Sequence, residues 1–524
     1  MTGHGLTAPA GRARRWFRRD VEAKLRDAVG GPARLRVVVL LACVLALDSA
    51  DKAAIGVTAV QLERALHIGN TGIGLLVTVS TAIGAVAALP VGSLTDRVNR
   101  TRLLVGAIVI WSLAMVVSGA AQSFLMLLIT RVALGAVVAT AGPVVASLTG
   151  DLFPAAERGR IFGFILTGEL AGAGIGLLVS GNVAAALSWR YSFWVLAVPG
   201  LALAWAIRRL LPEPARGGQS RLEPGAEHIR TAAQAEHEPA GSQFVGATEQ
   251  PADGGRQHDE VEREVQDEGI RPHERLVLHQ DPSGRSLWWA VRYVLSIRTN
   301  RVLIVASALG YFFFTGLRTF AVVFLRDRFG IGEGAASTLL VVIGIGAVVG
   351  LLFTARLSDW LIERHHLVAR PVVAGVSVLL AALLLLPALL TGSLLIALPL
   401  LFLAAAGVGG TNPPLDAARL DIMHSRLWGR AEAVRTALRS SLEALAPLVF
   451  GYVSTQFGAR TAGLGHPTGS AGAAGKGLRD TFLVMLIPLI AAGVLALVRA
   501  PRTYPRDVAT AIASEHATAT GPES

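Results

Sequence analysis

The chain has a single cysteine, Cys43, and few charged residues for its length. Only 16% of its 524 residues are Asp, Glu, Lys or Arg, whereas 52% are hydrophobic. One cysteine excludes an intramolecular disulfide and a cysteine-rich metal site. A soluble protein of this size would carry about 25% charged residues. The composition therefore indicates a membrane protein.

The sequence also lacks the motifs of a primary pump or an enzyme. Residues 475–477 read Gly-Lys-Gly, where a phosphate-binding loop requires Ser or Thr after the lysine. The glycines of 344–350 have the wrong spacing for a dinucleotide site. No nucleophile–base constellation is visible, and the histidines between 213 and 286 are irregularly spaced. We therefore expect no enzyme activity, no metal and no cofactor.

Long apolar segments are the main positive signal. A helix needs about 20 apolar residues to cross the hydrocarbon core of a bilayer, and twelve segments reach that length in two sets of six. They predict an all-α membrane protein with twelve transmembrane helices in two pseudo-symmetric six-helix bundles. The predicted spans are 36–60, 72–95, 102–121, 124–148, 159–184, 190–211, 301–325, 335–361, 368–391, 393–415, 431–457 and 480–499.

The net charge of +11 follows the predicted topology. Basic residues are concentrated in the N-terminal segment and in the even-numbered loops, which the positive-inside rule assigns to the cytoplasm. We therefore interpret the charge as a topology signal and expect no nucleic-acid partner. The predicted location is the plasma membrane, with multiple spans in the lipid bilayer and both termini cytoplasmic.

The polar segments divide the chain into five parts. Residues 12–29 have the spacing of a basic amphipathic helix on the membrane surface. A signal peptide is the competing interpretation, but the following apolar run is long and lacks a convincing cleavage site. Residues 213–286 have the composition of a disordered linker, and 287–300 of a second interfacial helix. The expected domains are 1–35, N-terminal segment; 36–212, first bundle; 213–300, linker and interfacial helix; 301–500, second bundle; 501–524, cytoplasmic tail.

The two halves carry related loop sequences. Ser93-Leu-Thr-Asp96-Arg97 has a counterpart in Arg356-Leu-Ser-Asp359-Trp360, so that Asp359 follows Asp96 by 263 residues (359 − 96). Similarly, Gly429-Arg430 follows Gly159-Arg160 by 270 residues (429 − 159). Duplicated halves with a site between them near the bilayer midplane are typical of secondary transporters.

The segment 92–100, Gly-Ser-Leu-Thr-Asp-Arg-Val-Asn-Arg, resembles the Gly-x-Leu-x-Asp-Arg-x-x-Arg motif of the major facilitator superfamily. Arg131-x-x-x-Gly135 resembles a second motif of that family. Asp51-Lys52 and 150–153 resemble its Spinster-like branch, although Val138 stands where that branch tends to have a glutamate. The resemblance implies a secondary transporter that moves a small organic solute by alternating access.

The same resemblance implies a cytoplasmic gate in the first short loop. Gly92 permits close helix approach because it has no side chain. The aspartate matching Asp96 latches the two halves shut in the family, and Arg97 and Arg100 are expected to pair with acids such as Asp151 or Glu157. The predicted gate residues are Gly92, Asp96, Arg97, Arg100 and Asp359.

Charged residues inside the spans are the candidate substrate-binding or proton-coupling groups, because burying an unpaired charge in a membrane is costly. Asp48, Asp51 and Lys52 share one face of the first helix. At about 1.5 Å rise per residue, Asp51 and Arg131 lie at matching depths, ~10 Å below the outer edge of the core. The expected Asp51–Arg131 contact is either a protonation switch or a static ion pair. Glu169 lies near mid-depth in the fifth span.

In the second half, Arg318 and Glu443 are the corresponding candidates. Arg318 either binds an anionic group on the substrate or extends to the interface. Glu443 follows Arg439 by one turn, so it is either a coupling residue or a member of a local ion pair. Asn412-Pro413-Pro414 interrupts helical hydrogen bonding and predicts a hinge.

The hypothesis is a proton-coupled carrier whose partners are a small-molecule solute and protons. Mixed charge at the site is compatible with zwitterions, organic acids and cationic drugs. Two alternatives stay open. One is a Spinster-like lysolipid or amphiphile carrier, and the other is a transport-dead membrane sensor that signals through the 213–286 linker.

Overall fold

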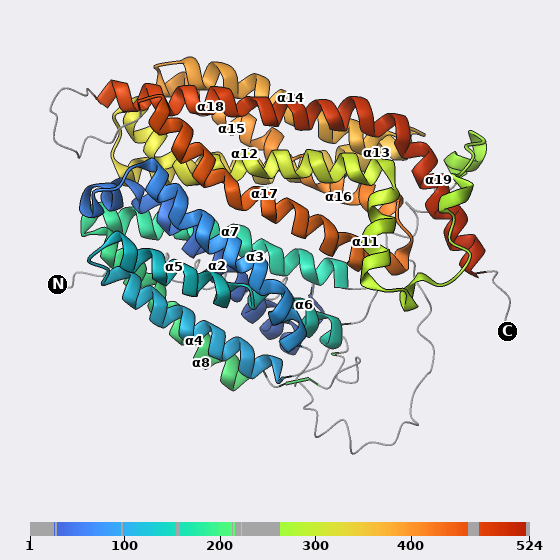
Figure 1. The fold of residues 1–524 in the computed structure, drawn as a ribbon, viewed down its shortest axis with the longest axis horizontal. Coiled ribbons are helices and arrows are strands. Elements are labelled where there is room, and N and C mark those ends of the chain that lie inside the picture. Colours follow the sequence, from blue (N-terminus) through green and yellow to red (C-terminus); the bar gives the residue numbers. More distant parts are fainter. Residues whose placement is uncertain are drawn as a thin grey trace, which may run out of the picture.

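The computed structural model describes residue 26 and residues 29–95, 98–153, 158–211, 213–214, 222, 263–458 and 471–519. All regular structure in these residues is helical. Figure 1 shows the first half of the chain (blue to green) and the second half (yellow to red) as two adjacent sets of roughly parallel helices. This arrangement confirms the predicted fold class.

The first bundle begins at Pro32, where a proline in the first turn sacrifices no intrahelical hydrogen bond. Side chains cap several of its helices: Asn99 accepts from the backbone N–H of Arg102 at 2.8 Å, and Ser123 from that of Met126 at 3.2 Å. Its helices are α2 (Pro32–Leu66), α3 (Asn70–Thr95), α4 (Arg100–Gly119), α5 (Phe124–Val138), α6 (Ala141–Leu152), α7 (Arg158–Ala186) and α8 (Trp189–Leu210).

The second bundle repeats this order, including one broken span. A helix break lies between α15 and α16 at the position of the predicted hinge, where the prolines of 412–414 occupy the first turn of α16. The equivalent break between α5 and α6 was not predicted, and it lies 271 residues earlier (410 − 139). The helices are α12 (Arg298–Phe329), α13 (Glu333–Ile362), α14 (Ala369–Leu390), α15 (Leu394–Gly409), α16 (Asn412–Asp421), α17 (Trp428–Gln456) and α18 (Ala471–Val494).

Ten helical segments of the described chain are long and apolar enough to cross a membrane. The two remaining predicted spans are α2 and α17, which are 35 and 29 residues long and carry several charged side chains. These two helices are therefore too polar over any such window to be recognised by length and apolarity alone.

Buried apolar residues form three clusters that define the two ends of the molecule. One cluster contains residues of both bundles, such as Ile55 and Phe320. A second belongs to the base of the second bundle, and a third to the base of the first. We call the end with the short loops 67–69 and 330–332 the hairpin end, and the end with the central linker the linker end. The bundles share a core toward the hairpin end and have separate cores at the linker end.

Close helix packing holds the hairpin end together. A Cβ atom at Gly74 of α3 would overlap the backbone of Pro447 in α17. Asn70 donates to Ser454 at 3.0 Å, and Gln61 of α2 donates to Glu333 of α13 at 2.9 Å. These contacts join helices of different bundles near the hairpin end.

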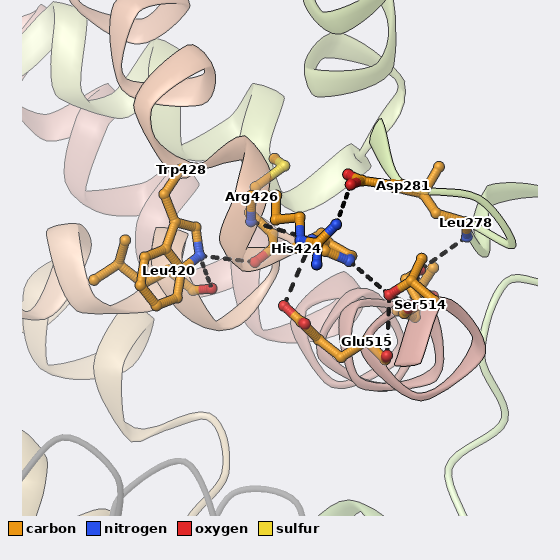
Figure 2. Close-up of polar contacts among 11 residues, drawn as sticks. Leu278, Asp281, Leu420, His424, Arg426, Trp428, Ser514 and Glu515 are labelled. Atoms are coloured by element: carbon orange, nitrogen blue, oxygen red, sulfur yellow. Dashed lines mark hydrogen bonds and ion pairs between the residues drawn. The ribbon is translucent and has the colours of Figure 1, made fainter. Parts of the chain in front are cut away.

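A folded cap covers the linker end of the second bundle. It comprises residues 263–286, α11 (Leu287–Ser296), the turn η5 (Ser425–Leu427) and α19 (Ala500–Ala519). In Figure 1, α11 runs across the ends of the spanning helices, and α19 continues from α18 through η6 (Leu495–Arg499), a π-helical turn. Figure 2 shows one seam of this cap, where His424 of the α16–α17 loop contacts Glu515 of α19.

The cap corrects the expectation that the whole 213–286 segment is disordered. Residues 263–286 are ordered here: Leu278 N–H donates to Ser514 Oγ at 3.0 Å, and that of His273 to Thr510 Oγ1 at 2.9 Å. Val265 is buried in the core of the second bundle's base. The order of these residues therefore comes from packing on α19 and the second bundle.

Candidate functional site

A buried ion pair lies inside the first bundle. Asp51 of α2 accepts from Arg131 of α5 at 2.9 Å, and their side chains are only 5% and 1% exposed. The Arg131 guanidinium also donates to Ser118 at 3.2 Å and lies 5.0 Å from the centre of the Phe193 ring. The contact expected from matching depth is therefore present, in a setting where removing one partner would leave the other charge uncompensated.

A second ion pair, one turn away, faces the interface between the bundles. Lys52 donates to Asp48 at 2.6 Å, and the Lys52 side chain is 40% exposed. Its ammonium interacts electrostatically with Glu169 of α7 and with Arg318 of α12, which belongs to the other bundle. Neither Glu169 nor Arg318 makes a hydrogen bond or an ion pair with any residue that the structure describes. Two charges of opposite sign, unpaired within the described residues, thus flank Lys52.

On the second bundle, Glu443 has local partners. It accepts from Thr315 at 3.1 Å and lies 3.8 Å from Arg439, one turn earlier on α17. The Arg439 guanidinium lies 4.1 Å from the centre of the Tyr311 ring, a cation–π geometry. Glu443 is therefore held in a network that joins α12 to α17.

Next to this network is a charge cluster that the sequence reasoning missed. Arg419 pairs with Asp416 on α16, and Arg435 pairs with Glu432 on α17. The arginine side chains are each 9% exposed, whereas the two carboxylates are more than half exposed. The signal in the sequence was the spacing of Arg and Glu by three or four residues along α17, which places them on one helix face.

At the linker end, each bundle has a buried arginine that pairs with an aspartate at its base. Arg100 pairs with Asp151 and with Glu213, at 2.9 Å for the latter, and it also donates to the Pro214 carbonyl at 2.9 Å. This matches the expected pairing of Arg100 with Asp151. All of these partners belong to the first bundle or to the start of the linker, so the contacts of Arg100 join elements within one half.

The second bundle has the equivalent group at Arg370. Arg370 pairs with Asp421, which also accepts from the Tyr504 hydroxyl of α19. Asp359, a predicted gate residue, lies 4.0 Å from Arg370 and is 37% exposed. Of the other predicted gate residues, Gly92 lies in α3, and Asp96 and Arg97 fall outside the described residues.

Across the part of the chain that the structure describes, no group of three or more His, Cys, Asp or Glu side chains could hold a metal ion. The polar groups described above instead lie inside the bundles and along the interface between them. Two repeated bundles of spanning helices, with charged residues between them, are the architecture of a membrane transporter.

The comparisons with known proteins agree with this class. The family model of the Major Facilitator Superfamily matches residues 41–447, and the chain belongs to this family. It is similar to solved structures of a bacterial homolog of the human lysosomal transporter Spinster. The inward-facing, unoccupied form has a TM-score of 0.67 at 21% identity and the occupied form 0.66 at 20%, each covering 91% of this chain and 98% of that one. The nucleoside transporter NupG matches with a TM-score of 0.56 at 12% identity, covering 89% and 98%.

Membership of this family identifies the chain as a transporter and not an enzyme. It is a multi-pass membrane protein.

Proposed function

We propose that this protein is a proton-coupled secondary transporter that moves a small charged or zwitterionic organic solute by alternating access. In this proposal the linker end faces the cytoplasm, both termini are cytoplasmic, and the protein resides in the plasma membrane. The conformation described above is then open to the cytoplasm and closed on the outside.

The observation that carries the proposal is the distribution of the three apolar cores. One core joins the bundles toward the hairpin end, and each bundle keeps its own core at the linker end. Each base is therefore stabilised without the other half. The bundles can rock about the shared region while each moves as a unit, which is the basis of alternating access.

Proton coupling rests on the carboxylates of α2. Protonating Asp51 would remove its attraction to Arg131 and leave a buried cation without a counter-charge. Protonation is therefore tied to a change in the packing of α2 against α5. The Lys52, Glu169 and Arg318 charges lie along the interface between the bundles, where a solute with both charge signs finds complementary partners.

The test begins with a thermal-stabilisation screen of purified protein against amino acids, organic acids, cationic drugs and lysolipids. A ligand that binds the folded state raises its melting temperature. The hit is then assayed for uptake into proteoliposomes with and without an imposed pH gradient. The proposal predicts gradient-driven accumulation in the wild type and its loss in Asp51→Asn.

The matched control is Asp480→Asn, which removes a carboxylate from a pair with Arg479 outside the interface described above. Size-exclusion chromatography checks that each variant is folded. Solute accumulation by the wild type that does not depend on the pH gradient would contradict proton coupling. Uptake of lysolipids alone would favour the amphiphile carrier, and binding without any transport would favour the sensor.

A further inference from the structure

A basic face lies on the surface of the second bundle at its linker end. It is formed by the start of α12 and by the junction of α18, η6 and α19. Segments 298–305 and 490–506 contain five arginines and no acidic residue. All five are exposed, and within the described residues none of their side chains makes a hydrogen bond or an ion pair. We call this set the arginine face: Arg298, Arg301, Arg499, Arg502 and Arg506.

Polar contacts of Thr299 bring the two parts of the arginine face together. Its backbone N–H donates to Asp507 at 2.8 Å, and its hydroxyl lies 2.6 Å from that of Thr503. Asp507 is only 1% exposed, so it belongs to the contact between the helices and not to the exposed face. The start of α12 is therefore fixed against the first turns of α19.

The direction of the two helices places their arginines on the same side of this contact. In Figure 1, α12 runs away from the linker end and α18 runs toward it, so the two are antiparallel. Arg298 directly precedes Thr299, and Arg502 directly precedes Thr503. Antiparallel helices turn in opposite senses when viewed from one end, so both arginines fall on one side. At about 100° per residue, the next arginine along each helix lies within about 60° of the first.

Exposed apolar residues next to these arginines place them at the edge of the membrane. Val494 and Val498 are 44 and 40% exposed, and Arg502 continues their line after one further turn. On α12, Val305 is 48% exposed and lies one turn from Arg301. Four residues of helix rise about 6 Å. The guanidinium groups therefore lie at headgroup depth, while the valines face the acyl chains.

We propose that the arginine face binds the phosphate headgroup of an anionic phospholipid. Arginine donates paired N–H groups to phosphate oxygens. The bordering valines give the acyl chains of the same molecule an apolar surface, which a free phosphate ion would not use. The proposal goes beyond transport and needs only that the linker end meets a membrane surface. A bound headgroup would bridge the start of α12 and α19 and so stabilise the cap on the second bundle.

The test measures lipid binding to the purified full chain in detergent by native mass spectrometry. Dioleoyl phosphatidylglycerol and dioleoyl phosphatidylcholine have the same acyl chains and differ in headgroup charge. The variant combines Arg301→Gln, Arg502→Gln and Arg506→Gln. Each arginine beside an anionic headgroup strengthens binding about fivefold, so the variant should lose roughly 100-fold in affinity for phosphatidylglycerol. Its affinity for phosphatidylcholine should stay the same.

The matched control removes three positive charges from the same end of the molecule. It combines Arg263→Gln, Arg271→Gln and Arg275→Gln, three exposed residues of the cap that have acidic neighbours in the sequence. The control should keep the wild-type preference for phosphatidylglycerol. An equal loss in both triple variants would show that net charge alone attracts the lipid, and it would overturn the site. Equal affinity of the wild type for the two lipids would overturn it as well.

Melting temperatures give a second readout that does not involve transport. A ligand of the folded state raises its melting temperature, so phosphatidylglycerol should stabilise the wild type and the control more than the Arg301/Arg502/Arg506 variant. Melts without added lipid show whether each variant is folded. Inorganic phosphate is the headgroup-only probe and should not displace phosphatidylglycerol at equal concentration. Displacement by inorganic phosphate would show a site for free phosphate and would contradict the lipid assignment.

Discussion

The bases of the two bundles each contain a buried Arg–Asp pair, but a different third residue binds to the pair in each base. Arg100 pairs with Asp151 in the first bundle and Arg370 with Asp421 in the second. Both residues of the pair recur after 270 residues (370 − 100 and 421 − 151). In the first base the arginine is completed by Glu213 of the linker, whereas in the second the aspartate is completed by Tyr504 of α19.

This difference shows which parts of the duplicated unit are fixed. The Arg–Asp pair ties the start of the third helix of each bundle to the end of its broken fourth span. The flanking segment differs: a carboxylate accepts from Arg100 in the first base, and a phenol donates to Asp421 in the second. The first base therefore depends on the linker, and the second on the C-terminal helix and the cap.

We expect the largest effect from breaking the Arg370–Asp421 pair. Asp421→Asn removes the carboxylate that pairs with the buried Arg370 and leaves Asp359 at 4.0 Å from it, so it should lower the stability by about 3–5 kcal/mol. Asp151→Asn should cost less, because Arg100 keeps Glu213 at 2.9 Å. Thermal melts in detergent measure both. Equal losses of stability in the two variants would show that Glu213 and Tyr504 do not affect the cost of removing the aspartate.

A smaller effect is expected where the bundles meet. Gly74→Ala would place a methyl group against the Pro447 backbone, at a cost of about 1–3 kcal/mol to the closed hairpin end. The conformational equilibrium should then shift toward the state that opens this end. Gly106→Ala is the control, because a Cβ at Gly106 meets nothing within 4 Å.

The shift can be measured as a distance at the linker end. Spin labels at Arg102→Cys and Glu363→Cys, both exposed positions, report on the two bases in a Cys43→Ser background. The population with short distances should grow in Gly74→Ala and stay constant in Gly106→Ala. A distance distribution unaffected by Gly74→Ala would argue against rocking about this contact.

A weaker shift in the same direction should follow Glu333→Ala. This change removes the hydrogen bond from Gln61, while Gln61 keeps its contacts with the Ala184 carbonyl at 2.6 Å and the Trp189 N–H at 2.7 Å. One such bond to a charged group contributes about 1.5–3 kcal/mol when buried, and less at this partly exposed position. The same spin-label pair measures it. A larger shift in Glu333→Ala than in Gly74→Ala would show that the Gln61–Glu333 hydrogen bond contributes more to the closed hairpin end than the Gly74–Pro447 packing.

The smallest effect is expected in the linker. Replacing residues 223–262 with a Gly-Ser segment of equal length should leave both melting temperature and uptake unchanged, because the described contacts of the linker involve 213–214, 222 and 263–286. A sensor that signals through this segment would lose its function. Loss of uptake in this variant, with normal folding, would contradict the transporter proposal as stated.

Apolar length predicted the helices, because crossing a bilayer demands a long uninterrupted run of apolar residues. Depth arithmetic predicted the Asp51–Arg131 contact because both residues lie within α-helices, whose rise per residue is fixed. The break at Ala139–Thr140 was missed although Gly142-Pro143 follows it, because a single proline is a weaker signal than the adjacent prolines Pro413-Pro414, which predicted the equivalent break. The composition of 263–286 predicted disorder, but these residues are ordered by contacts with α19, a helix that is distant in the sequence.

The π-helical turn Leu495–Arg499 has a consequence for the phase of the helix that follows it. A π turn accommodates about one extra residue, which rotates everything beyond it by about 100° relative to an uninterrupted α-helix. With this rotation the Tyr504 hydroxyl faces Asp421. Deleting a single residue from the turn would restore a regular helix and swing Tyr504 to another side. One inserted residue thus sets the angular alignment between the last spanning helix and the cap.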